Sequence, residues 1–121
     1  MNSILTSIKQ TLGIESAVTA FDVEIILAIN SALMMLDQLG IGPDGGLVIS
    51  SETEVWSDLL GDSTNLESVK SFVYLRTRLL FDPPTTAHLI DAIERQIREI
   101  EWRLVVQNEP IVIEEEVVDE T

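Results

Sequence analysis

Cysteine is absent from this 121-residue sequence, and histidine occurs once, at His88. Without a thiol, the chain can form no disulfide, no thiolate zinc site and no cysteine nucleophile. His88 has no carboxylate at metal-ligand spacing on both sides, so we interpret it as a partly exposed helix residue. Gly45-Gly46 lacks the lysine of a phosphate-binding loop. These absences predict that the protein is not an enzyme and holds no metal or other cofactor.

Basic residues are also scarce, with 7 Lys and Arg against 21 Asp and Glu and a formal net charge of −14. Binding to a nucleic-acid backbone requires clustered cationic side chains, so this balance argues against general DNA binding. The most apolar window, Val23–Leu39, contains too many polar residues to cross a membrane. No signal peptide is visible at the N-terminus. We therefore expect a soluble protein made in a cytoplasm, with no membrane partner.

Aromatic residues make up 5% of the chain, whereas 45% is hydrophobic, so the core must be mainly aliphatic. The length suits a single domain. We predict a helical domain over residues 1–109, followed by an extended acidic C-terminal tail over residues 110–121 that is flexible unless a partner binds it. The apolar triplet of this tail could add as a strand to a partner's sheet edge. It consists of Ile111, Val112 and Ile113.

The spacing of the apolar residues predicts an all-α fold, a small bundle of about four to five helices. The first helix covers Asn2–Leu12 and ends at Gly13, which is a favourable C-terminal cap. A second helix begins at the capping box Thr19-x-x-Asp22 and extends to about Leu39. Beyond it, residues 47–49 form either an edge strand or an extended crossing segment.

Capping residues predict two further helix starts. Ser51 or Thr53 caps a short helix, and a second capping box, Thr64-x-x-Glu67, begins a longer one. The double proline Pro83-Pro84 separates this longer helix from the last, because proline lacks a backbone N–H and disfavours helical angles in the residue before it. We predict a helical hairpin or corner at this Asp-Pro-Pro sequence, with the rest of the chain packed on it.

The last helix, capped by Thr85 or Thr86, extends to about Gln107 and is amphipathic. Its core-facing stripe consists of Leu89, Ile93, Ile97, Ile100 and Leu104. Acid-before-base pairs four residues apart add about 0.2–0.5 kcal/mol each to a helix. The predicted pairs are Asp91–Arg95, Glu94–Arg98 and Glu99–Arg103.

Two residues break the helical patterns. Arg76 falls inside the apolar sector that also contains Val69, Phe72, Val73, Leu79 and Leu80. Because an unpaired buried charge is costly, Arg76 either reaches solvent along its stem or pairs with a carboxylate of its own or another subunit. Trp102 lies almost opposite the core stripe of the last helix, near Val106. The N-terminal helix, the tail or a neighbouring subunit covers Trp102, or it is simply exposed.

The second helix carries an apolar stripe besides its main apolar face. Val23, Leu27 and Met34 form this narrower stripe between polar residues. Either the helix is buried on most sides within its own domain, or the stripe meets another subunit. Because two helices have such additional apolar residues, the pattern favours an oligomer.

One stretch of the chain resembles a known family. The run Val69-Lys70-Ser71-Phe72-Val73-Tyr74-Leu75-Arg76-Thr77-Arg78-Leu79-Leu80-Phe81-Asp82-Pro83-Pro84, together with the later Ile100-Glu101-Trp102-Arg103-Leu104, is similar to head-to-tail connector proteins of tailed bacteriophages. These are also called adaptor or head completion proteins. Gly40-Ile41-Gly42-Pro43 and the segment before Trp56 give weaker support. The resemblance covers residues 20–107.

The resemblance implies a virion protein at the head–tail interface, assembled in the host cytoplasm. It implies a homo-oligomeric ring, typically twelve-fold, that lies under the portal protein, extends the DNA channel without sequence-specific DNA binding, and contacts a stopper or tail-completion protein. The resemblance implies no catalytic residues. We predict that the contacts with other subunits, the portal or the stopper involve Arg76, Trp102, Val106, Val23, Leu27, Met34, Ile111, Val112 and Ile113.

Two other functions compete with this one. The chain could be a stopper or tail-completion component, although we expect such proteins to contain more β-structure. It could instead be an acidic inhibitor that mimics DNA, on the strength of its net charge alone. Mimicry requires regularly spaced acids on one exposed face, whereas the densest acids lie in the tail and the longest helix is nearly neutral.

Overall fold

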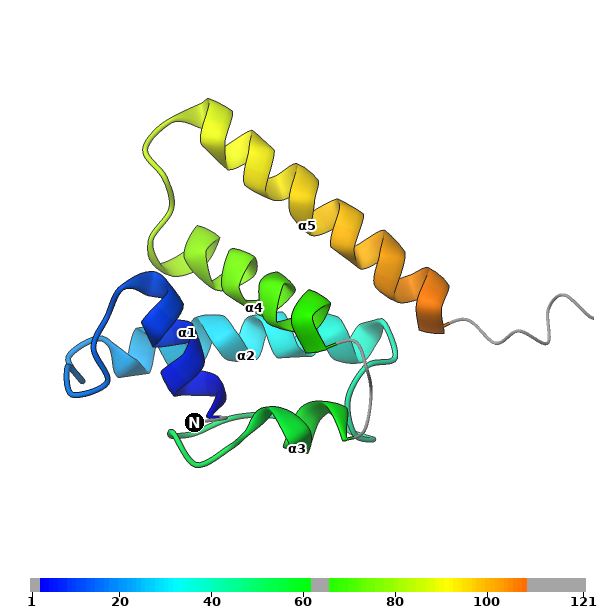
Figure 1. Ribbon diagram of the computed structural model, residues 1–121, viewed down its shortest axis with the longest axis horizontal. Coiled ribbons are helices and arrows are strands. Elements are labelled where there is room, and N and C mark those ends of the chain that lie inside the picture. Colours follow the sequence, from blue (N-terminus) through cyan, green and yellow to red (C-terminus); the bar gives the residue numbers. More distant parts are fainter. Residues whose placement is uncertain (1–2, 62–65, 109–121) are drawn as a thin grey trace, which may run out of the picture.

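A computed structural model of the protein describes residues 3–61 and 66–108 and contains five α-helices (Figure 1). In chain order they are α1 (Ile4–Leu12), α2 (Asp22–Gln38), α3 (Trp56–Leu60), α4 (Leu66–Phe81) and α5 (Ala87–Asn108). No β-strand forms in these residues, and Ser3 and Val55 make one isolated antiparallel bridge. The predicted all-α bundle is confirmed.

Helix α4 lies at the centre of the bundle. It packs against α1, α2 and α5, and its contact with α2 is the most extensive between any two helices. Val69, Phe72, Val73 and Thr77 of α4 are fully buried. Helix α5 lies alongside α4 and runs back in the opposite direction, so it forms an outer layer (Figure 1).

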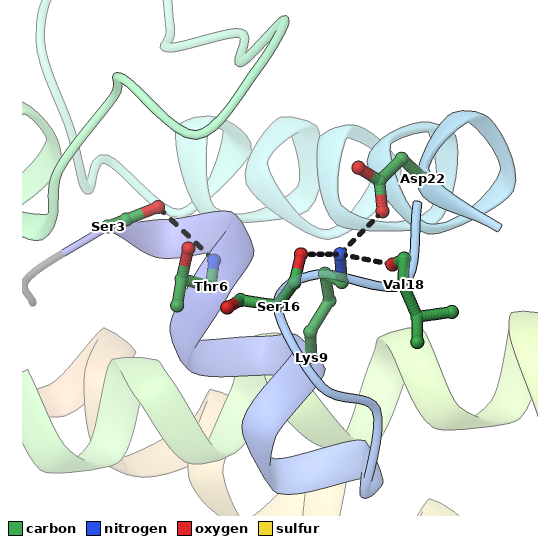
Figure 2. A network of polar contacts seen from close by, with 6 residues as sticks. All are labelled: Ser3, Thr6, Lys9, Ser16, Val18 and Asp22. Carbon is green, nitrogen blue, oxygen red and sulfur yellow. Dashed lines mark hydrogen bonds and ion pairs between the residues drawn. The ribbon is translucent and has the colours of Figure 1, made fainter. Parts of the chain in front are cut away.

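Helix α1 is capped at both ends by side-chain and backbone geometry. The Ser3 hydroxyl accepts a hydrogen bond of 3.2 Å from the backbone N–H of Thr6 (Figure 2). At the other end, Gly13 adopts φ 84°, a left-handed conformation that glycine takes without steric cost. The predicted end of the first helix is confirmed, and its start is set by Ser3.

Lys9 is a buried cation that joins α1 to the start of α2 (Figure 2). Its side chain is 3% exposed, and its ammonium lies 2.8 Å from Asp22 Oδ1. It also donates hydrogen bonds to the carbonyl oxygens of Ser16, at 3.2 Å, and Val18, at 2.7 Å. Two of the three ammonium donors thus bond backbone carbonyls, and the Asp22 carboxylate supplies the opposite charge. The charge is thereby compensated, and the loop between the two helices is held in place.

The prediction that Thr19-x-x-Asp22 forms a capping box is wrong. The N-cap residue of α2 is Phe21, which makes no side-chain cap hydrogen bond. Asp22 is instead the first residue of the helix, where a negative charge interacts favourably with the helix dipole. Its carboxylate faces Lys9, and a charge-assisted contact with a buried ammonium is stronger than a neutral capping bond.

The segment at residues 47–49 is an extended crossing segment and not a strand. Asn30 of α2 makes the hydrogen bonds that a neighbouring strand would otherwise make, because its side-chain amide bonds to both the N–H and the carbonyl of Ile49. Asn30 Oδ1 accepts from the Ile49 N–H at 2.8 Å, and Asn30 Nδ2 donates to the Ile49 carbonyl at 3.0 Å. Ile49 is thereby buried, whereas the side chain of Val48 is 70% exposed.

The predicted caps of the short helix are also wrong. The N-cap of α3 is Val55, whose backbone N–H donates to Asp58 Oδ2 at 2.9 Å. Ser51 belongs to a preceding turn, in which the Glu54 carboxylate accepts hydrogen bonds from the backbone of Ser50 and Ser51. Desolvation raises the pKa of Glu54, but these hydrogen bonds outweigh it and lower the pKa below its usual value. The Thr64-x-x-Glu67 box begins outside the described residues.

The double proline separates two helices as predicted, since α4 ends at Phe81 and α5 begins at Ala87. Thr86 Oγ1 accepts from the Leu89 N–H at 3.3 Å, so Thr86 is the residue that caps α5. Its backbone carbonyl also accepts from the Ile90 N–H.

The core stripe of α5 is confirmed in part. Ile93, Ile97 and Leu104 are buried and Ile100 is half-buried, but Leu89 is 50% exposed. Figure 1 shows that α5 diverges from α4 toward its N-terminal end, and Leu89 belongs to the first turn of that end. Leu80 at the end of α4 is likewise 56% exposed.

The three ion pairs predicted along α5 do not form. Among the described residues, Lys9–Asp22 is the one ion pair within 4.0 Å. Exposed pairs gain little over hydration of the separate charges, so their absence costs the helix little. In residues 3–61 and 66–108, no helix is both long and apolar enough to cross a membrane.

Replacing Lys9 with methionine tests the importance of the buried cation. Lys9→Met keeps most of the apolar stem but leaves Asp22 and two carbonyls without their donor, so we expect a loss of about 2–4 kcal/mol in the free energy of unfolding. Urea unfolding followed by circular dichroism measures it. Lys70→Met, at a half-buried lysine of α4 whose Nζ lies 5.9 Å from the centroid of the Trp56 ring, is the control, and loss of that cation–π contact should cost only about 0.5–1 kcal/mol. A loss no larger than that of the control would contradict a stabilising role for Lys9.

Candidate assembly surfaces

The described residues hold no cluster that could bind a metal ion. No group of three or more His, Cys, Asp and Glu side chains converges within residues 3–61 and 66–108. His88 lies exposed in the first turn of α5. The features that call for a functional explanation are instead exposed apolar side chains, most of which lie on three parts of the surface.

The first surface is the α2 stripe, formed by Val23, Leu27 and Met34. These side chains are 70%, 65% and 62% exposed and lie opposite the buried face of the helix. Burial of α2 on most sides within its own domain, one of the two alternatives, is therefore wrong. An interface with another subunit stays a prediction for this stripe.

The second surface is the end groove, an open hollow of about 420 Å³ between the start of α2 and the end of α4. It is lined by Phe21, Glu24, Leu27, Ala28, Leu80 and Phe81. The rings of Phe21 and Phe81 pack edge to face with their centroids 5.8 Å apart, which joins the two helix ends. Phe21 is 48% exposed and Leu80 is 56% exposed.

Sequence reasoning missed the end groove. Its lining comes from two segments that are about fifty residues apart in the sequence, so no local pattern reveals it. A partial signal was available at Leu80, which falls just before the double proline. The double proline indicates that the helix ends close to Leu80 but not which side chains cover it there.

The third surface is the α5 patch, formed by Trp102, Val105 and Val106, which are 67%, 37% and 45% exposed. The N-terminal helix does not cover Trp102, so that alternative is wrong. The tail residues Ile111, Val112 and Ile113 lie outside the described residues. Arg98 precedes Trp102 by four positions and is its neighbour along the helix surface.

Arg76 of α4 is half-buried within the apolar sector, as its spacing predicts. Its Nε atom is buried without a hydrogen-bond partner. No carboxylate lies within 4.0 Å of its guanidinium among the described residues, so pairing inside this part of the chain is excluded. A contact with another subunit stays a prediction for Arg76.

The predicted interface residues do not form one surface. Val23, Leu27 and Met34 lie on α2, and the end groove continues the stripe through Leu27, which belongs to both. The α5 patch lies toward the C-terminal end of α5. In Figure 1 this end is on the opposite side of the molecule from the start of α2 and the end of α4. Each chain therefore presents two separate apolar surfaces.

Comparison with known proteins identifies a family. The model of a family described as phage connector protein matches residues 4–110. No curated protein and no solved structure gives a significant match.

Truncation of exposed and buried α5 side chains tests the placement of Trp102. Trp102→Ala should change the free energy of unfolding of the monomer by less than about 0.5 kcal/mol, because the side chain lies largely in solvent. Leu104→Ala, two residues further along, should cost about 2–5 kcal/mol because Leu104 is fully buried. Urea unfolding at low protein concentration measures both. Equal losses would place Trp102 in the core.

Proposed function

The chain belongs to the phage connector protein family, and from this premise we propose that it forms a ring between the portal and the tail or stopper of a tailed phage. In this role it extends the DNA channel and completes the head after packaging. It acts in the virion, after assembly in the host cytoplasm. Its partners are further copies of itself, the portal protein, and a stopper or tail-completion protein.

The observation that carries this proposal is the pair of separate apolar surfaces on one small subunit. A two-fold dimer uses the same surface on both copies, whereas a ring uses two different surfaces on each copy. The α2 stripe with the end groove supplies one such surface, and the α5 patch supplies the other. Contiguous exposed apolar patches often mark sites of protein–protein interaction.

The charge of the chain suits a channel through which DNA passes. Tight binding to DNA requires cationic contacts with phosphates, and each subunit carries a formal net charge of −14. Acidic side chains at the channel would repel the phosphates, so DNA would slide through the ring without sticking. No sequence-specific binding is needed for this role.

The two competing functions have less support. The helical fold favours an adaptor over a stopper component, for which we expect more β-structure. A DNA mimic requires an acidic exposed face, but the long helix α5 interleaves four acids with Arg95, Arg98 and Arg103.

Light scattering on the purified protein, alone and mixed with the cognate portal protein, tests the proposed function. We expect rings, formed either by the protein alone or on the portal, because ring contacts can require that template. Negative-stain electron microscopy of the same samples would give the ring symmetry, expected to be twelve-fold. A protein that stays monomeric, never binds the portal and inhibits a DNA-binding nuclease would contradict the proposal and favour the DNA mimic.

A further inference from the structure

The end groove is an apolar hollow with a single charged residue in its lining. Phe21, Leu27, Leu80 and Phe81 supply apolar surface, and Glu24 supplies a carboxylate. Glu24 has no hydrogen-bond or ion-pair partner in the described part of the chain. By contrast, Asp22 in the same turn of α2 is occupied by Lys9. The groove therefore suits a large apolar side chain accompanied by a hydrogen-bond donor or a positive charge.

The α5 patch has this chemistry. Trp102 is a large amphipathic side chain that is 67% exposed, and its indole N–H needs an acceptor once water is excluded. The volume of the groove, about 420 Å³, exceeds that of an indole ring. Arg98, one turn before Trp102, has no ion-pair partner among the described residues. One carboxylate has enough lone pairs to accept from both a guanidinium and an indole N–H.

The positions of the two surfaces exclude a contact within one chain and favour a repeated contact between chains. The groove lies at the start of α2 and the end of α4, whereas Trp102 lies toward the far end of α5 (Figure 1). The two surfaces differ in shape and in charge, so they are complementary to each other and not to themselves. Such a pair generates a head-to-tail series, which closes into a ring at the appropriate rotation.

We propose that Trp102 of one copy inserts into the end groove of the next copy, where Arg98 pairs with Glu24. This inference rests on the proposed ring function and specifies the contact from which the ring is built. Val105 and Val106 beside Trp102 pack at the rim of the groove, and the rest of the α2 stripe continues the apolar contact.

The absence of native cysteine allows a direct cross-linking test in the full-length chain. Leu80→Cys places a thiol in the groove, and Val106→Cys places one beside Trp102. With a short bismaleimide, a mixture of the two single variants should give a covalent dimer, and the double variant should give a ladder of higher oligomers. Each single variant alone should give neither. Efficient cross-linking of one single variant with itself would show a two-fold contact and overturn the inference.

Charge exchange tests the Glu24–Arg98 pair. Glu24→Arg and Arg98→Glu should each weaken assembly by about tenfold or more, measured as the protein concentration at which half of the chains are assembled. The combined variant should recover most of this loss, because the pair is restored with opposite polarity. Glu52→Arg, an equal charge change at an exposed loop position, is the control. If assembly of the combined variant is not restored, Glu24 and Arg98 do not pair in the contact.

Trp102→Ala tests the side chain that fills the groove. We expect about tenfold or greater weakening of assembly with an unchanged melting curve of the monomer. His88→Ala, on the same helix at its opposite end, is the control. If Trp102→Ala assembles normally while deletion of residues 110–121 abolishes assembly, the tail fills the groove and the inference is wrong.

The same experiments separate the inference from the proposed function. Normal rings from both Trp102→Ala and Glu24→Arg would overturn the groove contact and leave the ring function standing. A wild-type chain that never assembles, either alone or with the portal, would overturn both.

Discussion

The structure depends on the burial of α4 by three other helices. Val69, Phe72, Val73 and Thr77 lose all contact with solvent because α1, α2 and α5 each pack on a part of the same helix. Helix α5 has its main contact with α4, so its position follows from that one interface. Since one face of α4 is fully covered, the exposed apolar side chains lie mainly on the outer sides of α2 and α5 and at the end of α4.

Two polar contacts hold the loops of this cysteine-free chain in place. The ammonium of Lys9 fixes the loop between α1 and α2 by bonding two of its carbonyls and the first residue of α2. The amide of Asn30 fixes the extended segment around Ile49 by bonding both of its backbone groups. Both contacts satisfy buried polar groups whose burial without a partner would cost free energy of folding. Each joins parts of the chain that are distant in sequence, so the spacing of apolar residues does not reveal it.

The sequence predicted the helices better than it predicted their partners. Apolar periodicity and the proline and glycine positions depend on neighbours along the chain, so the helix ends at Leu12 and Phe81 were predictable. The roles of Asp22 and Asn30 depend on residues distant in sequence, and a capping motif was therefore misread. Leu80 and Leu89 were assigned to the core because periodicity gives the direction of a side chain but not where the facing helix ends. The exposed position of Trp102 follows from its place opposite the core stripe of α5, whereas no local sequence pattern indicates the end groove.

The double-proline corner leaves the first turns of α5 less constrained than its last ones. With 22 residues, α5 is about 33 Å long, and it is attached to the bundle mainly along one side of α4. Leu104 near its C-terminal end is fully buried, whereas Leu89 in its first turn is 50% exposed. A change in the angle of this short turn should therefore move the exposed start of α5 and leave its anchored end, which carries Trp102, in place.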